Sequence, residues 1–189
     1  MSLYYGYVTL PVDSYDSFRA AIIGNAYNAD YFAGFQCWDV VSEAYYNFGW
    51  GQGYPITQSG GNGQAWMCWT YSKEVNSGNG ISLVYNLSDV KRGDIVVLNG
   101  TTQNPDGHIT FADEDYDGSG YLWCVGQNQG GTPLPEGGTV NTRNQLGMGD
   151  FLGAFRYDAW QPTPPTPTTT KKRFPWVLYA RKFRERRAS

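Results

Sequence analysis

The hydrophobic pattern of the chain changes once, near residue 81, and this change constrains the fold more than any other feature. Before it, apolar residues in 14–24 and 37–48 recur every three or four positions, which predicts two amphipathic helices. After it, short apolar runs end at Gly, Asp or Asn and predict strands. These runs are 95–98, 109–112, 121–125 and 152–157. Helices followed by strands indicate an α+β fold, with N-terminal helices packed on an antiparallel β-sheet.

The segment between the helices and the strands is less regular. Residues 49–63 are rich in Gly and contain Pro55, so we expect a loop. Residues 64–75 predict a third, shorter helix. Four tryptophans in this part of the chain are candidate walls of a substrate groove, although the last two equally fit a core: Trp38, Trp50, Trp66 and Trp69.

A stretch rich in Pro and Thr marks the end of the folded part. We predict a domain over residues 1–160 and an extended linker over 161–170. Residues 171–189 hold eight of the fourteen basic side chains. We interpret this basic tail as the start of a truncated second module; the alternative is a segment that adheres to anionic polymers or membrane surfaces.

The rest of the chain is acidic, with six basic and sixteen acidic side chains and a net charge of −10. This balance argues against nucleic acid as a partner, because a nucleic-acid-binding core carries a basic surface. The first residues lack the basic and apolar stretches of a secretory signal. No apolar run approaches the length of a membrane span, so we expect no stable membrane insertion. We also expect a monomer.

The chain has one histidine, His108, and three cysteines. Three cysteines are too few for a disulfide framework, and we expect Cys68 and Cys124 to be buried free thiols rather than a bridged pair. Cys37 is the candidate nucleophile because it opens the helix over 37–48. The dipole and the free N–H groups of a helix N-terminus lower the pKa of a thiol. His108 is then the only imidazole that could act as its base.

Two neutral side chains complete this candidate catalytic set. Gln36, directly before Cys37, could donate an N–H to a developing oxyanion. Asn128 follows a predicted strand and could orient the His108 imidazole.

Three short motifs carry a resemblance to a known family. They are Gln36-Cys37-Trp38-Asp39 at a helix start, Gly93-Asp94-Ile95-Val96 followed by Gly107-His108-Ile109, and Gly126-Gln127-Asn128. In order and spacing the chain resembles the CHAP domain family of cysteine, histidine-dependent amidohydrolases/peptidases over roughly residues 12–157. The resemblance implies a papain-like, NlpC/P60-type fold and peptidoglycan hydrolysis. It also implies that Cys37 is the nucleophile, His108 the base and Asn128 a supporting residue.

One position departs from the family pattern. Many members carry an acidic residue two positions before the asparagine, where this chain has Gly126. The orienting role then belongs to Asn128 alone or to a carboxylate from elsewhere. Candidate carboxylates, among which the sequence does not choose, are Asp113, Glu114 and Asp115.

The residues ahead of Cys37 suggest a calcium site. Oxygen-bearing groups recur with the rhythm of a twelve-residue calcium loop, at Asn28, Asp30, Phe32 (carbonyl), Gly34 (carbonyl) and Asp39. The strict motif fails, because Ala33 stands where a Gly is usual and Asp39 replaces a Glu. Some phage-derived CHAP domains resemble this arrangement. In the alternative interpretation, Asn28 and Asp30 form a turn and Asp39 caps the helix.

These features predict a peptidoglycan hydrolase of a phage endolysin or a bacterial cell-wall lysin. Its target is either the N-acetylmuramoyl–L-alanine amide or a peptide bond of the cross-bridge. Without a visible signal, we expect a phage product made in the host cytoplasm that acts on the wall, or a secreted protein. Two alternatives stay open: a non-catalytic wall-binding module, and a papain-like cysteine peptidase of soluble peptides.

Overall fold

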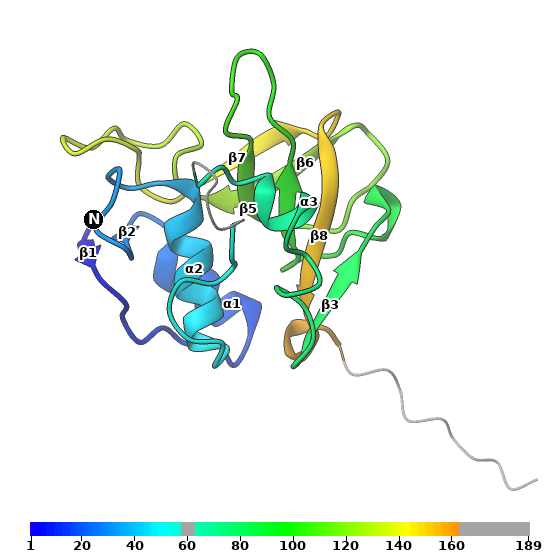
Figure 1. Ribbon diagram of the computed structural model, residues 1–189, viewed down its shortest axis with the longest axis horizontal. Helices are drawn as coiled ribbons and strands as arrows, with labels where there is room; N and C mark the ends of the chain where they lie inside the picture. Colours follow the sequence, from blue (N-terminus) through cyan, green and yellow to red (C-terminus); the bar gives the residue numbers. More distant parts are fainter. Residues whose placement is uncertain (58–62, 163–189) are drawn as a thin grey trace, which may run out of the picture.

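One antiparallel sheet dominates the computed structural model, which describes residues 1–57 and 63–162. Within these ranges its six strands are, in chain order, β3 (Ile81–Val84), β4 (Ile95–Leu98), β5 (His108–Ala112), β6 (Tyr121–Gly126), β7 (Thr142–Gly147) and β8 (Phe151–Tyr157). Their order across the sheet is β3-β8-β4-β5-β6-β7 (Figure 1). The last strand therefore lies between β3 and β4, while β4 to β7 follow one another as hairpins.

The helices precede the sheet in the chain, as predicted. The remaining elements are β1 (Leu3–Tyr5), α1 (Tyr15–Ile22), β2 (Ala26–Asn28), α2 (Cys37–Asn47), α3 (Met67–Thr70), and the 3-10 turns η1 (Leu87–Asp89) and η2 (Asp158–Trp160). β1 and β2 form a small parallel pair, and α2 packs against both β2 and β5. This packing brings the start of α2 to the start of β5.

Local sequence explains where α1 begins and which face it buries. The hydroxyl of Ser14 accepts a hydrogen bond from the Ser17 backbone N–H at 3.1 Å, which caps the helix. Tyr15, Phe18 and Ile22 recur at three- and four-residue spacing and are buried.

The strands alternate between two apolar layers. Ile95 and Val97 belong to the main core under the helices, whereas Val96 between them belongs to a smaller cluster on the opposite face. Phe111 and Ala112 divide in the same way. This period-two alternation is that of a sheet covered on both faces.

The structure confirms the α+β class and the four predicted strands, but it corrects two details. The helix expected over 64–75 is a single turn, α3. β3 and β7 were not predicted. β7 is an edge strand that carries polar side chains at most positions, so it lacks the apolar signal of a strand. The linker from residue 163 onward and the basic tail lie outside the described residues.

Cys68 and Cys124 are buried free thiols, as expected. Among the described residues, no helix combines the length and the apolar character that crossing a membrane requires.

A buried carboxyl group in α2 gives the fold a predicted pH dependence. Glu43 is fully buried; its Oε2 accepts the Val8 backbone N–H at 3.1 Å, and its Oε1 has no hydrogen-bond partner in the part of the chain that the structure describes. Burial raises the pKa of Glu43 to about 7 from an ordinary 4.5, and the Val8 hydrogen bond only partly opposes this. The unfolded chain therefore loses this proton at lower pH than the folded chain. The free energy of unfolding should fall by about 3 kcal/mol as the pH rises from 4.5 to 7.

Glu43→Gln should remove this part of the pH dependence, because its amide does not ionise. Urea unfolding at pH 5 and pH 8 measures the difference for parent and variant. Glu74→Gln, at an exposed side chain, is the matched control and should keep the parent's slope. The prediction would be contradicted if the free energy of unfolding of Glu43→Gln fell between pH 5 and pH 8 as much as the parent's does.

Candidate active site

Cys37 is the first residue of α2, and a carboxylate fixes the chain that leads into it. Asp39 accepts hydrogen bonds from the backbone N–H groups of Gln36 at 2.7 Å and Ala29 at 2.8 Å. These bonds cap the helix and hold the preceding loop against it. Cys37 is half-buried, and its own N–H is one of the helix-start donors that have no partner within the helix.

His108 is the first residue of β5, opposite Leu98 of β4. The preceding Gly107 has a φ of +67°, and a Cβ built on it would lie 2.5 Å from the Leu98 carbonyl oxygen. Both facts demand glycine at this position. The Gly-His pair of the sequence motif thus has a backbone cause: the glycine allows the turn that aims the imidazole at α2.

The side chains of Cys37 and His108 meet and shift each other's pKa. Burial alone would raise the pKa of the Cys37 thiol, but the charge and hydrogen bond of His108 outweigh it and lower the pKa. Burial likewise opposes a charged His108, yet the Cys37 thiolate and the hydrogen bond that His108 donates to Gln129 raise its pKa. The two groups therefore favour a thiolate–imidazolium pair.

The third sequence motif holds the segment around Gln36. Gln127 is fully buried; its amide accepts the Tyr27 N–H at 2.8 Å and donates to the carbonyls of Tyr27 and Gln36 at 2.7 and 2.9 Å. Asn128 donates to the side-chain oxygen of Gln36 at 3.0 Å. The Gln36 side-chain nitrogen in turn donates to the Ala33 carbonyl at 2.6 Å.

Gln129, which sequence reasoning missed, makes the contact with His108 that was expected of Asn128. His108 Nε2 lies 3.0 Å from Gln129 Oε1. Asn128 has a left-handed φ of +59°, so the strand alternation breaks there and its neighbour faces the imidazole instead. A lone glutamine after the motif carries no pattern that would have singled it out.

The three candidate carboxylates that follow His108 in the chain form ion pairs with basic side chains. The partners are Arg19 and Arg143 for Asp113, Arg143 for Glu114, and Lys91 for Asp115. These ion pairs tie the end of β5 to its surroundings. They correct the expectation that one of the three orients His108.

Asp94 of the second motif is also structural. Its buried carboxylate binds Arg156 of β8 at 2.8 and 2.7 Å and accepts the Lys91 backbone N–H at 2.8 Å. The motif thus joins β4 to β8 beside the core.

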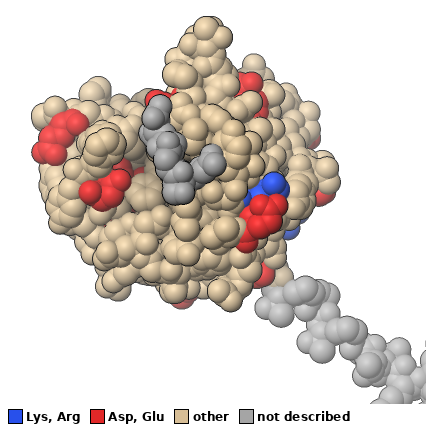
Figure 2. Space-filling model, in the orientation of Figure 1, with Lys and Arg blue, Asp and Glu red and all other residues tan. Residues whose placement is uncertain are grey.

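A cleft of about 320 Å³ opens over Cys37. Gln36 and Trp38 line it beside the thiol, and the carboxylates of Asp30 and Asp106 also border it. Uncharged side chains dominate the face of the molecule seen in Figure 2, where Asp and Glu outnumber Lys and Arg. Such a surface does not favour a polyanionic ligand.

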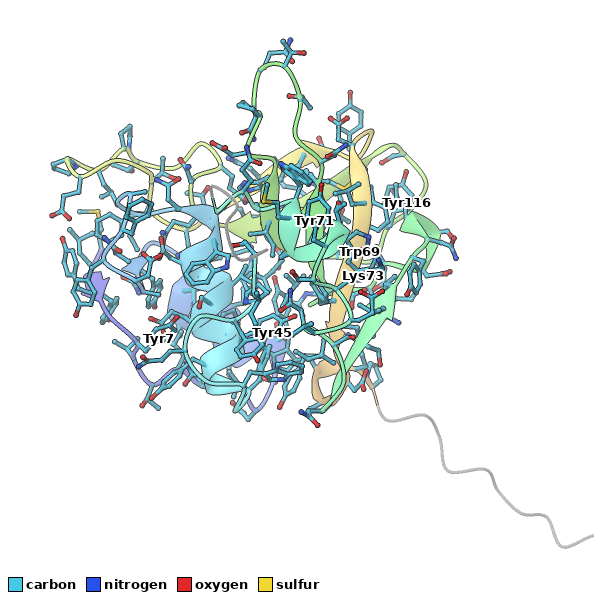
Figure 3. The ribbon with its side chains drawn as sticks, in the orientation of Figure 1. Tyr7, Tyr45, Trp69, Tyr71, Lys73 and Tyr116 are labelled. Carbon is cyan, nitrogen blue, oxygen red and sulfur yellow. The ribbon has the colours of Figure 1, made fainter. Side chains whose placement is uncertain are left out.

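The four candidate groove tryptophans separate into different roles. Trp38 lines the cleft, and its indole N–H donates to the Pro55 carbonyl at 2.9 Å. Trp69 is buried and packs edge-on against Phe155 of β8, beside the labelled Lys73 (Figure 3). Trp50 packs on Tyr45 beyond the far end of α2. Trp66 is half-buried, and its indole N–H donates to the Pro105 carbonyl at 3.2 Å.

The predicted calcium ligands occupy β2, the loop after it and the first turn of α2. Asp30 accepts the Phe32 N–H at 2.8 Å, so the turn-forming interpretation holds for it, as the capping interpretation does for Asp39. Asn28 is buried, and its side-chain oxygen has no partner among the described residues. No cluster of three or more His, Cys, Asp or Glu side chains suited to a metal occurs in the described ranges. The predicted calcium ligands include only two such side chains, Asp30 and Asp39, and so do not form a cluster of that kind.

Comparison with known proteins gives one relative and one structure of note. The chain is 34% identical over 122 residues to the D-alanyl-L-alanine endopeptidase of Streptococcus phage B30, covering 62% of this chain but 25% of that protein. The chain thus spans about a quarter of the relative's length. The crystal structure of the endolysin LysIME-EF1 superposes with a TM-score of 0.56 at 23% identity, over 74% of this chain and 61% of that one. This chain shares its fold with an endolysin. No protein-family model matches it.

Proposed function

We propose that this chain is the catalytic part of a phage endolysin that hydrolyses a peptide bond of peptidoglycan by cysteine catalysis. The observation that carries the proposal is the contact of His108 with Cys37, which stands at a helix N-terminus and lines an open cleft. The phage relative is named for a D-alanyl–L-alanine endopeptidase activity, which favours a cross-bridge bond over the N-acetylmuramoyl–L-alanine amide.

In the first half of the reaction, the Cys37 thiolate attacks the carbonyl carbon of the scissile amide. The oxyanion that forms lies near the free N–H of Cys37 and the second side-chain N–H of Gln36, whose first N–H donates to Ala33. The His108 imidazolium gives its proton to the leaving amine, the C–N bond breaks, and a thioester remains on Cys37.

In the second half, neutral His108 takes a proton from water, and the resulting hydroxide attacks the thioester carbonyl. The C–S bond breaks, a carboxylic acid leaves, and the thiolate–imidazolium pair is restored. Asn128 supports both halves by holding the Gln36 side chain that faces the cleft.

Digestion of purified Gram-positive peptidoglycan tests this function. We expect falling turbidity, new free amino groups and, by mass spectrometry, fragments cut at a D-alanyl–L-alanine bond. Fragments cut between N-acetylmuramic acid and L-alanine would instead make the chain an amidase. Sedimentation with walls but no new amino groups would indicate a binding module, and cleavage of soluble peptides with intact walls left alone would indicate a general peptidase.

We also propose that Ca²⁺ binds ahead of the nucleophile. The ligands would be the side chains of Asn28, Asp30 and Asp39 and the carbonyls of Phe32 and Gly34. The unpartnered, buried Asn28 oxygen supports this assignment, because such a group needs a partner. Each carboxylate oxygen that accepts an N–H keeps a further lone pair for a cation. When bound, the ion would stabilise this segment and so fix the position of Cys37.

Calcium is therefore expected to raise the melting temperature by about 5–10 °C at a hundredfold excess over its Kd. Chelator should reverse the shift. Asp30→Asn is the matched variant, because asparagine can still accept the Phe32 N–H but lacks the ligand charge, and its shift should be much smaller. A melting temperature indifferent to both calcium and chelator would rule out the site.

A further inference from the structure

The environment of Gln129 leaves only one orientation for its side chain. This residue is buried, and its side-chain nitrogen donates to the backbone carbonyls of Cys124 and Thr142, both at 3.0 Å. Carbonyl oxygens only accept hydrogen bonds, so the nitrogen must lie on that side. The amide oxygen must then lie on the other side, 3.0 Å from His108 Nε2 and 2.7 Å from the Thr110 hydroxyl.

This orientation determines which imidazole nitrogen carries hydrogen. Because the Gln129 oxygen is an acceptor, His108 Nε2 must be the donor in their hydrogen bond. The other ring nitrogen, Nδ1, is left to exchange a proton with Cys37. The same bond sets the plane of the ring, since Nε2 has one N–H direction.

The Gln129 side chain also occupies space that a side chain at position 126 would need. A Cβ built on Gly126 would lie 2.5 Å from the Thr110 hydroxyl oxygen and 2.8 Å from the Gln129 amide oxygen. Gly126 is the position at which the CHAP pattern has an acidic residue. A carboxylate in place of the Gln129 amide would face two carbonyl oxygens without a hydrogen to give them, so this pocket selects an amide.

We propose that Gln129 is the positioning residue of this site: it fixes His108 as the Nε2–H form and aims Nδ1 at Cys37, in place of the acidic residue absent at 126. The positioning role of Gln129 rests on the proposed function, but the hydrogen bond between Gln129 and His108 does not. A neutral amide orients the imidazole without adding a negative charge beside it. The site therefore differs in chemistry from one built on a carboxylate.

The single histidine makes the contact directly observable by ¹⁵N NMR, because only one imidazole contributes. An imidazole N–H exposed to water exchanges too fast to be seen, whereas one held by a buried acceptor persists. We expect a protected Nε2–H signal in the parent that is lost in Gln129→Met. Gln145→Met, the same substitution at an exposed position of β7, should keep it.

Kinetics provide the second readout. Gln129→Met should lower kcat about tenfold to a hundredfold with little change in KM, while Gln145→Met leaves both unchanged. Absence of the Nε2–H signal in the parent, or its survival in Gln129→Met, overturns the proposal; if that variant does not fold, the parent spectrum alone decides. A protected signal in a chain that hydrolyses no peptidoglycan would leave the contact standing and reject the proposed function.

Discussion

Cys37→Ala is expected to lower the rate of amino-group release from peptidoglycan by roughly 10⁴-fold or more. Without the sulfur no thioester forms. Substrate binding and oxyanion stabilisation by themselves accelerate hydrolysis far less than the complete site does. The variant should fold, because Cys37 is half-buried and alanine suits the first turn of α2. It should still sediment with the walls, since the cleft is otherwise intact.

Cys124→Ala is the matched control for this loss. Cys124 is also a free thiol, but it lies in the smaller core cluster on the opposite face of the sheet. Its substitution should cost some stability and leave the rate per folded molecule unchanged. Equal activity of the parent and Cys37→Ala would contradict cysteine catalysis.

His108→Ala is expected to lower kcat about 10²- to 10⁴-fold, because it removes the group that moves protons in both halves of the reaction. It should also remove the charge that lowers the pKa of Cys37. Burial then dominates, and the pKa of the thiol should rise. Alkylation of Cys37 by iodoacetamide at pH 7 should therefore slow in the variant, because the thiolate is the reactive form.

The alkylation rate separates this role from a loss of fold. An unfolded chain would expose Cys68 and Cys124 as well, so peptide mapping of the alkylated sites is the control. Unchanged alkylation of Cys37 in folded His108→Ala would show that the imidazole does not act on the thiol.

The sequence predicted the elements that carry regular apolar signals. The strand at 95–98 and the helix from Cys37 are found where expected, because each buries a continuous apolar face. β7 was missed because its residues Thr142 to Gln145 are polar, and pairing with β6 alone makes it a strand. The expected helix around Trp69 is a single turn, because Trp69 packs on the sheet and the Asn76 side chain, not a further turn of helix, donates to the Cys68 carbonyl.

In the candidate site, the contact between Cys37 and His108 was predictable, because both stand in distinctive motifs. The amide that contacts the imidazole was not, because Asn128 and Gln129 are adjacent and the sequence does not reveal which one faces His108. That choice depends on the left-handed backbone of Asn128 and on two carbonyls that come from β6 and β7. Both are products of the tertiary fold.

Capture of the thioester would test the central claim most directly. The parent is mixed with soluble peptidoglycan fragments, quenched in acid, and mapped by peptide mass spectrometry. We predict an acyl group on Cys37 whose mass equals the carbonyl half of the cleaved bond, and none on Cys68 or Cys124. Cleavage products that accumulate with no adduct on Cys37, and that Cys37→Ala also forms, would contradict the account.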